Sequence, residues 1–589
     1  MARIPPPSPQ PAPSAPGESG PRAGSEEVEL YQRTYTTLLR SSGETRLRIL
    51  ESGHKAMQSS LHPLADSEQL DLGAFLYATQ RLPVAIAGAR VVIMGQEAEL
   101  FERAGIGPLG AWTPVEAAAR RRRWFEGPED DGIWAVLLAS ASDLDDLIPT
   151  LVAYQIEWNK LRRRLRGVGW PRAQGLPGAE ECARVLGGAA DDWTRLQEVW
   201  GTSYAERLGR VAERGLSLRV RMLGGSQVGY ARMTRRWWAP VREQLERDEL
   251  RDAPMYVVSS NTHSLVNLVS GDARAREEEI VAWVDRDGPG DLQAELSMFR
   301  SGASQGSWEN FLYFAVRDFY AAGADDDARR VAEQDVGISH LSSRTALRVA
   351  AQVLPLARLD PERFDARLGA VDRDRLAASE AVIVNVDYPL GVAAYNILRE
   401  VTQDRDTLRG VYVLGKAATL NADVGDVMLS NVVFDEHSQT TYWLDNAFGI
   451  EDITPYLRFG SGLDNQRAVT VKSTFLQNRG YLDRYYREAY TVVEMEAGPY
   501  CNAIYELTDP DRYPVGEQVN FSKLPVDFGI IHYASDTPYT QARTLGARGL
   551  SYYGMDSTYA SSLAILRRIL RQEGALKNDP DHEGVGQIR

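Results

Sequence analysis

The residues best suited to chemistry lie at positions 492–498, which read Val-Val-Glu-Met-Glu-Ala-Gly. The β-branched start predicts a strand, and Glu494, Met495 and Glu496 stand where that strand gives way to a helix. A carboxylate held at such a junction can accept hydrogen bonds from two neighbouring hydroxyl groups, which is what a ribose ring offers. The alternative is structural, because negative charge also stabilises the first turn of a helix.

A second candidate is the run at 530–537, which reads Ile-Ile-His-Tyr-Ala-Ser-Asp-Thr. An apolar strand ends here in Ser535 and Asp536. A partly desolvated aspartate at a strand end can keep a proton and pass it to a leaving group as a general acid. Because Ser, Asp and Thr are also favoured in turns and at helix starts, a turn or N-cap is the alternative.

Small residues follow a third apolar run. Positions 415–420 read Gly-Lys-Ala-Ala-Thr-Leu, and Val-Gly-Asp-Val follows at 424–427. A glycine such as Gly415 lets the backbone approach a ligand closely, and Lys416 beside it carries a positive charge. The turn therefore adds two candidate binding residues.

These candidates stand among strand-like and helix-like runs that alternate from residue 379 onward. We expect strands at 381–386, 410–414, 426–434, 468–471, 491–495 and 526–534, and helices at 389–399, 481–488, 496–507 and 561–571. The alternation predicts an α/β fold in which helices cover both faces of a mixed sheet. Ligands of such folds bind at the carboxyl ends of the strands, where the candidates are found.

In this order, the motifs resemble those of the nucleoside phosphorylase/nucleosidase superfamily, over about residues 378–573. The matching features are the small-residue turn at 415–420, the Val-Gly-Asp strand start at 424–426, Val-Glu-Met-Glu-Ala at 493–497 and the final Ser-Asp at 535–536. The resemblance implies an α/β/α domain that cleaves the bond between a purine and ribose.

The resemblance also implies a role for individual residues. Glu496 would hold the ribose 2′ and 3′ hydroxyls while Met495 packs against the sugar, and Phe475 would stack on the purine. Asp536, steadied by Ser535, would protonate N7 as the glycosidic bond breaks. The expected substrate-binding set is Gly415, Lys416, Thr474, Phe475, Glu494, Met495, Glu496 and Ser535.

Departures from the family pattern bear on the choice of reaction. Phosphorylases of the family carry two phosphate-binding arginines, at positions that are Gly391 and Val413 in this chain. Water is therefore the expected nucleophile, and Asp387 is the nearest carboxylate that could orient it. A nucleotide substrate would also need cations, for which Lys416, Lys472 and Arg479 are the candidates.

The preceding region, residues 29–377, is expected to be mainly helical, with one or two subdomains and some α/β structure. Short apolar runs at 90–94, 133–139 and 255–258 are candidate strands. The polar turn at 259–264 is read as a helix cap, with anion binding as the alternative. The arginine run at 120–123 is read as the solvated face of a helix, with binding of an acidic partner as the alternative.

The ends of the chain differ in composition from the rest. Residues 1–28 are rich in proline and predict a disordered tail, and residues 574–589 predict a flexible one. The N-terminal residues do not resemble a signal peptide, because they contain no apolar core.

The overall composition narrows the class of protein. A net charge of −15 argues against a general nucleic-acid binder. No apolar stretch is long enough for a membrane helix, and two isolated cysteines fit a reducing cytoplasm. We find no metal-ligand spacing and expect no cofactor. The family resemblance further implies a homo-oligomer.

Together these residues predict a purine nucleosidase that acts on a nucleoside or a nucleotide, with a regulatory or assembly-forming N-terminal region. The alternatives are a non-catalytic nucleotide sensor, a phosphorylase with an atypical phosphate site, and an assembly scaffold. The role of residues 29–377 does not follow from the sequence.

Overall fold

The computed structural model describes residues 26–41, 43–119, 122–128, 131–170, 178–323, 326–403, 407–509, 512–521, 523–538 and 552–577. Within these ranges the chain folds into an α/β protein with two mixed sheets, one of six strands and one of eleven. None of the helices in these ranges combines the length and apolar character that a membrane crossing needs.

The strands of the smaller sheet come first in the chain: β1 (Thr45–Arg46), β2 (Val91–Gly95), β3 (Thr113–Val115), β4 (Arg123–Glu126), β5 (Ile133–Leu137) and β6 (Arg219–Leu223). The larger sheet contains β7 (Met255–Ser260), β8 (Ser339–Leu341), β9 (Ala351–Pro355), β10 (Val382–Asp387), β11 (Leu408–Thr419), β12 (Val427–Asp435), β13 (Thr440–Leu444), β14 (Gly462–Thr470), β15 (Val492–Glu494), β16 (Gln518–Phe521) and β17 (Asp527–Asp536).

The helices before the larger sheet are α1 (Glu26–Ser41), α2 (Glu51–Ala56), α3 (Leu72–Arg81), α4 (Glu99–Arg103), α5 (Ala141–Gly167), α6 (Ala179–Leu186), α7 (Ala190–Trp200), α8 (Tyr204–Glu213) and α9 (Gln227–Arg247). The later ones are α10 (Ser264–Ser270), α11 (Asp272–Ala275), α12 (Glu277–Asp287), α13 (Gly290–Ser301), α14 (Trp308–Ala321), α15 (Asp326–Asp335), α16 (Arg373–Ala377), α17 (Val392–Thr402), α18 (Arg479–Arg487), α19 (Ala497–Thr508) and α21 (Tyr552–Gln572).

The strands expected from residue 379 onward are present as β10, β11, β12, β14, β15 and β17. The boundary expected at residue 378, however, falls inside the larger sheet. Strand β7 lies between β10 and β11 and is parallel to both, and β9 pairs with β10. The sheet therefore draws three strands from the region before residue 378, because strand pairing joins segments that are distant in sequence.

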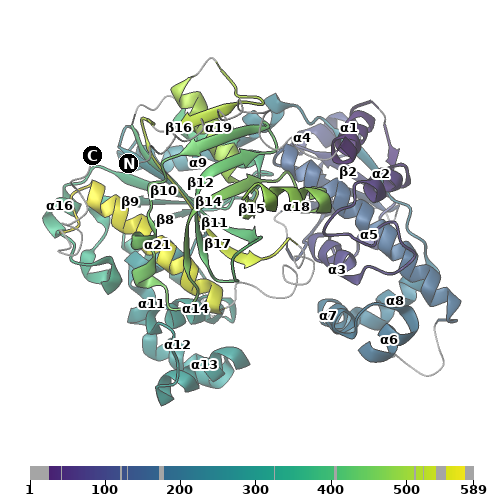
Figure 1. The fold of residues 1–589 in the computed structure, drawn as a ribbon, viewed down its shortest axis with the longest axis horizontal. Coiled ribbons are helices and arrows are strands. Elements are labelled where there is room, and N and C mark those ends of the chain that lie inside the picture. The colour runs from purple at the N-terminus through teal and green to yellow at the C-terminus, as the bar shows by residue number, and fades with distance from the viewer. Residues whose placement is uncertain are drawn as a thin grey trace, which may run out of the picture.

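Successive side chains of the central strands point to opposite faces of the larger sheet and pack in two different cores. In β7, Met255 and Val257 pack on one side while Tyr256 and Val258 pack on the other. Such alternation is the geometry of a strand buried on both faces. Helices α9, α17 and α19 contribute to the first core, and α10, α14 and α21 to the second. Figure 1 shows α21 lying across the larger sheet.

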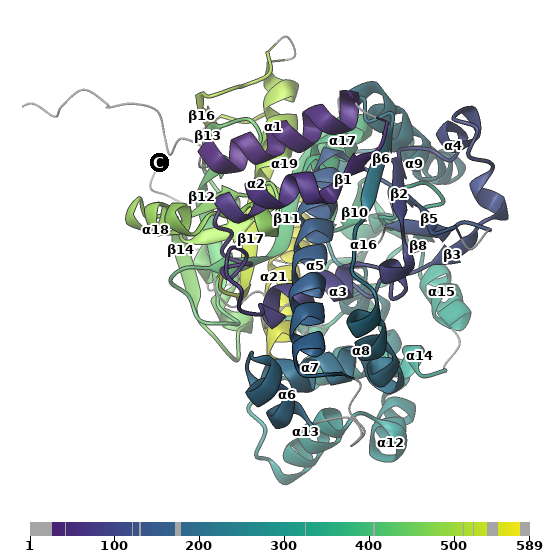
Figure 2. The same cartoon turned by 90° about the vertical axis from the view of Figure 1, so that its right-hand side faces the viewer.

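The smaller sheet and its helices form the N-terminal part of the molecule. Its strands run in the order β1-β6-β2-β5-β4-β3. The region is mainly helical with some α/β structure, as expected, and the apolar runs at 90–94 and 133–139 form β2 and β5. Helix α5, 27 residues long, is buried along most of its length. Figure 1 shows α1, α2, α3 and α5 gathered beside the larger sheet, and Figure 2 shows α5 running through this group.

A buried polar chain crosses the N-terminal core. His54 Nε2 lies 3.0 Å from His62 Nδ1, and His62 Nε2 lies 2.8 Å from Glu157 Oε1. The Lys160 ammonium lies 2.6 Å from the same carboxylate oxygen. Burial first, and then the neighbouring His62 and Lys160, hold the pKa of His54 well below its usual value. His54 is therefore neutral in the folded protein near neutral pH.

One hydroxyl group joins the N-terminal part to the larger sheet. Ser142, in the first turn of α5, is fully buried, and its Oγ accepts a hydrogen bond of 2.9 Å from the backbone N–H of Val392. That N–H belongs to the first turn of α17, where helices leave their N–H groups unsatisfied. Ser142 therefore caps a helix of the other sheet.

The chain ends differ in part from expectation. Residues 1–25 lie outside the described ranges, but α1 begins at Glu26, so residues 26–28 belong to a helix. Near the other end, Ala575 is buried and Leu576 forms a bridge with Val371. Residues 574–577 are therefore part of the packed structure, while residues 578–589 lie outside the described ranges.

Replacing Ser142 by alanine should lower the free energy of unfolding by about 1–2 kcal/mol, because the part-buried Val392 N–H would lose its acceptor. Urea unfolding of both proteins measures the difference. The matched control is Ser217→Ala at an exposed position, which should change stability by less than about 0.5 kcal/mol. Equal effects of the two substitutions would contradict the capping role.

Stability should fall as the pH drops below about 6.5, the usual pKa of histidine. Below that pH the unfolded chain binds a proton at His54 that the folded protein does not. The contribution of the neutral His54 to the free energy of unfolding is therefore fully present above that pH and is lost below it. His54→Gln removes this contribution, and urea unfolding at pH 7, 6 and 5 should show a shallower loss for the variant. Parallel curves would show that His54 titrates normally in the folded state.

Candidate functional site

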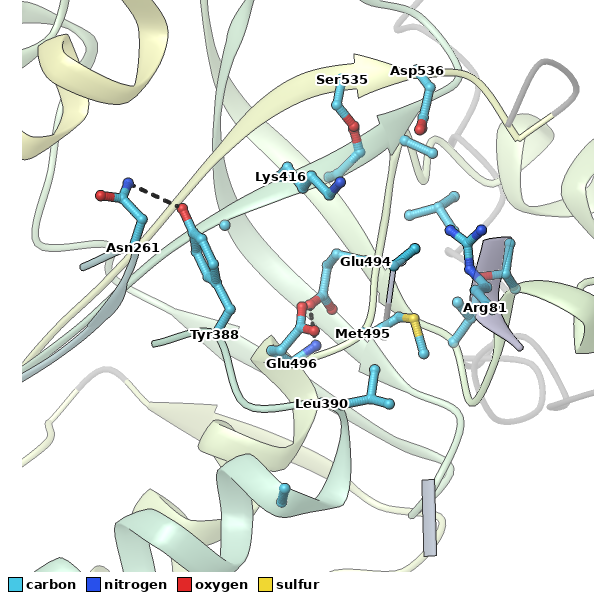
Figure 3. Close-up of a pocket in the computed structure, with 18 of the residues that line it drawn as sticks. Arg81, Asn261, Tyr388, Leu390, Lys416, Glu494, Met495, Glu496, Ser535 and Asp536 are labelled. Carbon is cyan, nitrogen blue, oxygen red and sulfur yellow. Dashed lines mark hydrogen bonds between the residues drawn. The ribbon is translucent and has the colours of Figure 1, made fainter. Parts of the chain in front are cut away.

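A cavity of about 600 Å³ opens at the carboxyl ends of β11, β15 and β17. Glu494, Met495, Glu496, Ser535 and Asp536 all line it, and Figure 3 shows their side chains around one space. Cavities of this size are typical of small-molecule sites. The structure therefore brings the two main motifs of the sequence together, across the end of the larger sheet.

The junction between β15 and α19 separates the roles of the two glutamates. Glu494 is buried, and its Oε2 accepts hydrogen bonds from the backbone N–H groups of Glu496 (2.6 Å) and Ala497 (2.7 Å). Its other oxygen accepts a hydrogen bond from Thr470 Oγ1, which in turn accepts one from Gly498 N at 2.8 Å. Glu494 is thus the helix cap that the sequence offered as the alternative.

Glu496 occupies the N-cap position of α19, and its side chain is half-buried in the cavity wall. Figure 3 shows the bond that ties its backbone to Glu494. Since Glu494 holds the helix start, the Glu496 side chain is carried on a backbone with little freedom. A carboxylate oriented in this way can accept hydrogen bonds from a diol.

A β-bulge brings Asp536 into the cavity. In the pairing of β17 with β11, Ala534 lies opposite Ala417 and Asp536 lies opposite Ala418, so Ser535 is an extra residue. Bulges redirect side chains at the ends of strands, and both Ser535 and Asp536 line the cavity. The Ser535 hydroxyl donates to the carbonyl oxygen of Ala417 at 3.3 Å, and Asp536 is buried.

Strand β11 contributes a positively charged side chain and the residues next to it to the cavity wall. Gly415, Lys416, Ala417 and Ala418 line the cavity. The Lys416 side chain is the exposed one on this strand end, and Figure 3 shows it between Tyr388 and Asp536 in the view. Thr474 also lines the cavity. The expected binding residues on these segments are therefore grouped together.

The segment after β7 forms another wall, with Asn261 and His263. Asn261 Oδ1 accepts from His263 N (3.0 Å) and Ser264 N (2.6 Å), so it caps α10 as expected for this turn. Its amide donates to the Tyr388 hydroxyl at 3.4 Å. Tyr388 has φ +36°, a conformation that residues other than glycine rarely adopt and that surrounding contacts must hold.

His263 is a neutral imidazole at this wall. Burial, followed by Arg317 and Arg329, lowers its pKa to about 3. Its Nδ1 lies 3.2 Å from the hydroxyl of Tyr559. A neutral imidazole partnered at one nitrogen can form a hydrogen bond to a ligand or a water at the other.

The N-terminal part forms a further section of the cavity wall. Tyr77 and Arg81 from α3, and Arg122, Ser140 and Asp143 near the start of α5, all line it. Segment 474–479 is also held by this part, because Ser60 N donates to Gln477 O at 2.8 Å and Asn478 Nδ2 donates to Met57 O at 2.7 Å. A ligand in the cavity would therefore contact both parts of the chain.

Phe475 does not lie where a base-stacking residue should. Its side chain is fully buried, with ring centroids 5.2 Å from Tyr77 and 5.9 Å from His54, and it is not among the cavity-lining residues. The neighbouring Thr474 lines the cavity instead. Phe475 turns away because the N-terminal part offers it an aromatic core.

Asp387 is also outside the set of residues that line the cavity, although the next residue, Tyr388, belongs to it. Strand β10 ends at Asp387, where the chain pairs with Ser260 of β7. Lys472 and Arg479 are not lining residues either. The Lys472 ammonium donates to Gln32 Oε1 at 3.1 Å, so Lys416 is the one of the three expected cations that faces the cavity.

The two positions expected to lack phosphate-binding arginines are closed to long side chains. Gly391 has φ +55°, and a Cβ there would collide with Ser142 Oγ. Val413 is buried between β7 and β17, opposite Ser259 and Ile530. No cation can occupy either position without rearrangement of the surrounding structure.

Several lining residues were not predicted from the sequence, namely Tyr77, Arg81, Arg122, Ser140, Asp143, Asn261, His263, Arg348 and Tyr388. The turn at 259–264 did carry a signal, since its polar residues follow an apolar run. Arg122 was read as part of a solvated helix face, but it is buried and pairs with Asp143 and Asp146. Those partners lie more than twenty residues later.

Comparison with solved structures finds a distant likeness to nucleosidases and phosphorylases. A 5′-methylthioadenosine/S-adenosylhomocysteine nucleosidase from Colwellia psychrerythraea 34H, in complex with adenine, matches at 13% identity over 41% of this chain and 89% of its own, with a TM-score of 0.27. The enzyme of the same name from Neisseria meningitidis, in complex with methylthio-immucillin-A, matches at 14% identity over 42% and 95%, with a TM-score of 0.26.

Uridine phosphorylase from Schistosoma mansoni, in complex with uracil, matches at 10% identity over 57% of this chain and 93% of its own, with a TM-score of 0.29. Likeness at these TM-scores is too low to assign an activity to this chain. No curated protein matches it significantly.

A family match covers most of the sequence. Residues 47–571, which include the larger sheet, every strand of the smaller sheet except β1, and every cavity-lining residue named above, match a family of unknown function (DUF6909). The chain belongs to this family.

Proposed function

We propose that the protein is a purine nucleosidase, which hydrolyses the N-glycosidic bond of a purine nucleoside or nucleotide. The observation that carries the proposal is that Glu496 and Asp536, from two different strand ends, line one cavity of about 600 Å³. The resemblance of their motifs to those of nucleoside phosphorylases and nucleosidases gives each carboxylate a role.

In this reaction Glu496 accepts hydrogen bonds from the 2′ and 3′ hydroxyls, and Met495 packs against the sugar. Asp536 donates a proton to N7 of the base while the bond between C1′ and the base nitrogen breaks. Water then adds to C1′ and releases a proton, so that the products are the free base and the sugar. The Ser535 hydroxyl, anchored on Ala417 O, helps to hold the strand end that carries Asp536.

Hydrolysis is favoured over phosphorolysis because Gly391 and Val413 offer no cation and no space for one. In place of Asp387, we assign the positioning of the water to His263, which lines the cavity and is neutral near pH 7. The imidazole would orient the water through a hydrogen bond, and the proton that the water loses as it bonds to C1′ would pass to solvent.

A nucleotide sensor is the second candidate. The N-terminal part lines the cavity through Tyr77, Arg81, Arg122 and Ser140. A bound ligand would therefore contact both parts of the chain and could change how they pack without being cleaved. Binding without turnover is the behaviour that separates this candidate from the enzyme.

The first test incubates the protein with purine nucleosides and nucleotides, with and without inorganic phosphate, and measures free base by chromatography. We expect base release without phosphate. Asp536→Asn should lower kcat by about 10²–10⁴-fold, as for loss of a general acid, and Glu496→Ala should raise KM and lower kcat.

The outcomes distinguish the candidates. Release that requires phosphate would contradict hydrolysis. Absence of release, with ligand binding that Glu496→Ala removes, would replace the enzyme by the sensor.

The second test concerns the water. His263→Gln should lower kcat by about 10²-fold with little change in KM, because a misplaced water slows only the chemical step. Asp387→Asn is the comparison, and its effect should be much smaller. A large loss for Asp387→Asn beside a small one for His263→Gln would return the role to Asp387.

A further inference from the structure

A chain of hydrogen bonds runs from His263, at the cavity wall, into the core behind it. His263 Nδ1 lies 3.2 Å from the hydroxyl of Tyr559 in α21, and Asn267 Nδ2 donates to the same hydroxyl at 2.7 Å. Asn267 stands one turn after His263, and its backbone N–H donates to the carbonyl oxygen of His263 at 2.9 Å. Because residues four apart along a helix are neighbours on its surface, both side chains reach the one hydroxyl of α21.

The Tyr559 hydroxyl is held in a fixed position. Tyr559 is fully buried, and its ring centroid lies 4.9 Å from that of Tyr313. Three residues further along α21, Ser562 Oγ donates to Ser264 Oγ in α10 at 2.8 Å, and both serines are buried. This contact ties α21 to α10, so the Tyr559 hydroxyl stays beside the two α10 residues that it contacts.

The direction of these hydrogen bonds follows from the number of protons. The Asn267 Nδ2 group only donates, so the Tyr559 oxygen accepts from it and keeps its single proton for His263 Nδ1. Nδ1 is then the acceptor and carries no proton. Burial, followed by Arg317 and Arg329, lowers the pKa of His263 to about 3, so the imidazole has one proton near pH 7. That proton is on Nε2.

Nε2 is the nitrogen that remains for a ligand. His263 is half-buried and lines the cavity. Within the described residues, Nε2 is neither hydrogen-bonded nor among the fully buried polar atoms that have no partner, so it keeps accessible surface. Asn261 Oδ1 holds the His263 backbone by accepting from its N–H at 3.0 Å, and Figure 3 shows Asn261 across the view from Asp536. The imidazole is thus fixed on one side and open on the other.

We propose that Tyr559 and Asn267 are positioning residues that fix the tautomer of His263, so that its Nε2–H donates to the oxygen of the water. This inference deepens the proposed function and rests on it, because only hydrolysis requires a water at this place. It makes the imidazole a hydrogen-bond donor, which cannot take the proton that the water loses. Neither Tyr559 nor Asn267 lines the cavity, so both act through His263.

The experiment determines the tautomer by NMR and does not depend on turnover. The full chain is labelled with 15N-histidine, and the signals of His263 are identified among those of the seven histidines by their loss in His263→Gln. We expect a protonated Nε2 and an unprotonated Nδ1 at pH 7. The opposite tautomer, with the proton on Nδ1, would overturn the proposal.

Asn267→Asp should reverse the direction of the chain. A carboxylate only accepts, so the Tyr559 hydroxyl would donate to it, and the Tyr559 oxygen would then accept from His263 Nδ1–H. We expect Nδ1 to become protonated in this variant. The control is Asn465→Asp, at an exposed position of β14, which changes the net charge equally and should leave the His263 signals unchanged. Unchanged signals in Asn267→Asp would contradict the proposal.

Tyr559→Phe is a second variant, which removes the donor to His263 Nδ1. We expect a mixture of the two tautomers and, in the assay of base release, a kcat about 10–10²-fold lower with little change in KM, because the water is misplaced. Tyr412→Phe is the matched control, since Tyr412 is equally buried and its hydroxyl donates to Asp527 Oδ2 at 2.6 Å. Equal tautomers and equal kcat in the two variants would show that Tyr559 does not act through His263.

The inference and the proposed function fail in different ways. Absence of base release, with the Nε2–H tautomer present in the wild-type protein and reversed in Asn267→Asp, would remove the nucleosidase and keep the donor that Tyr559 fixes. Base release together with the Nδ1–H tautomer would keep the nucleosidase and overturn the inference.

Discussion

The Glu494 carboxylate is the contact on which the rest of the candidate site depends. It ends β15, is buried, and accepts the first backbone N–H groups of α19. Helix starts that are buried need such acceptors, so this carboxylate holds the start of α19 as well as lining the cavity. This contact holds the backbone of Glu496, two residues later, at the edge of the cavity. One acidic residue is thus used to position another.

The second constraint is that the cavity is built from both parts of the chain. The larger sheet supplies Glu496, Asp536 and Lys416, whereas the N-terminal part supplies Arg81, Arg122 and Ser140. The Ser142 hydroxyl and the segment at 474–479 join the two parts close to that cavity. A change in how the parts pack would therefore alter the site directly.

Local patterns were sufficient to predict β10, β11, β12, β14, β15 and β17, but they did not predict β13 or β16. Pairing between distant segments was not predictable in this way. Strand β7 lies between β10 and β11, and the residues around Met255 do not indicate which strands it pairs with. Phe475 and Arg122 were misread for the same reason, since Tyr77 and His54 draw the first into a core and Asp143 and Asp146 bury the second.

The central claim is that Glu496 and Asp536 hold the same molecule. The most direct measurement is a crystal structure of the Asp536→Asn variant with AMP bound. We expect both Glu496 carboxylate oxygens, or one shared oxygen, to lie about 2.6–3.2 Å from the ribose 2′ and 3′ hydroxyls, with residue 536 beside N7 of the base. A nucleotide bound elsewhere, or bound here with its ribose hydroxyls away from Glu496, would contradict it.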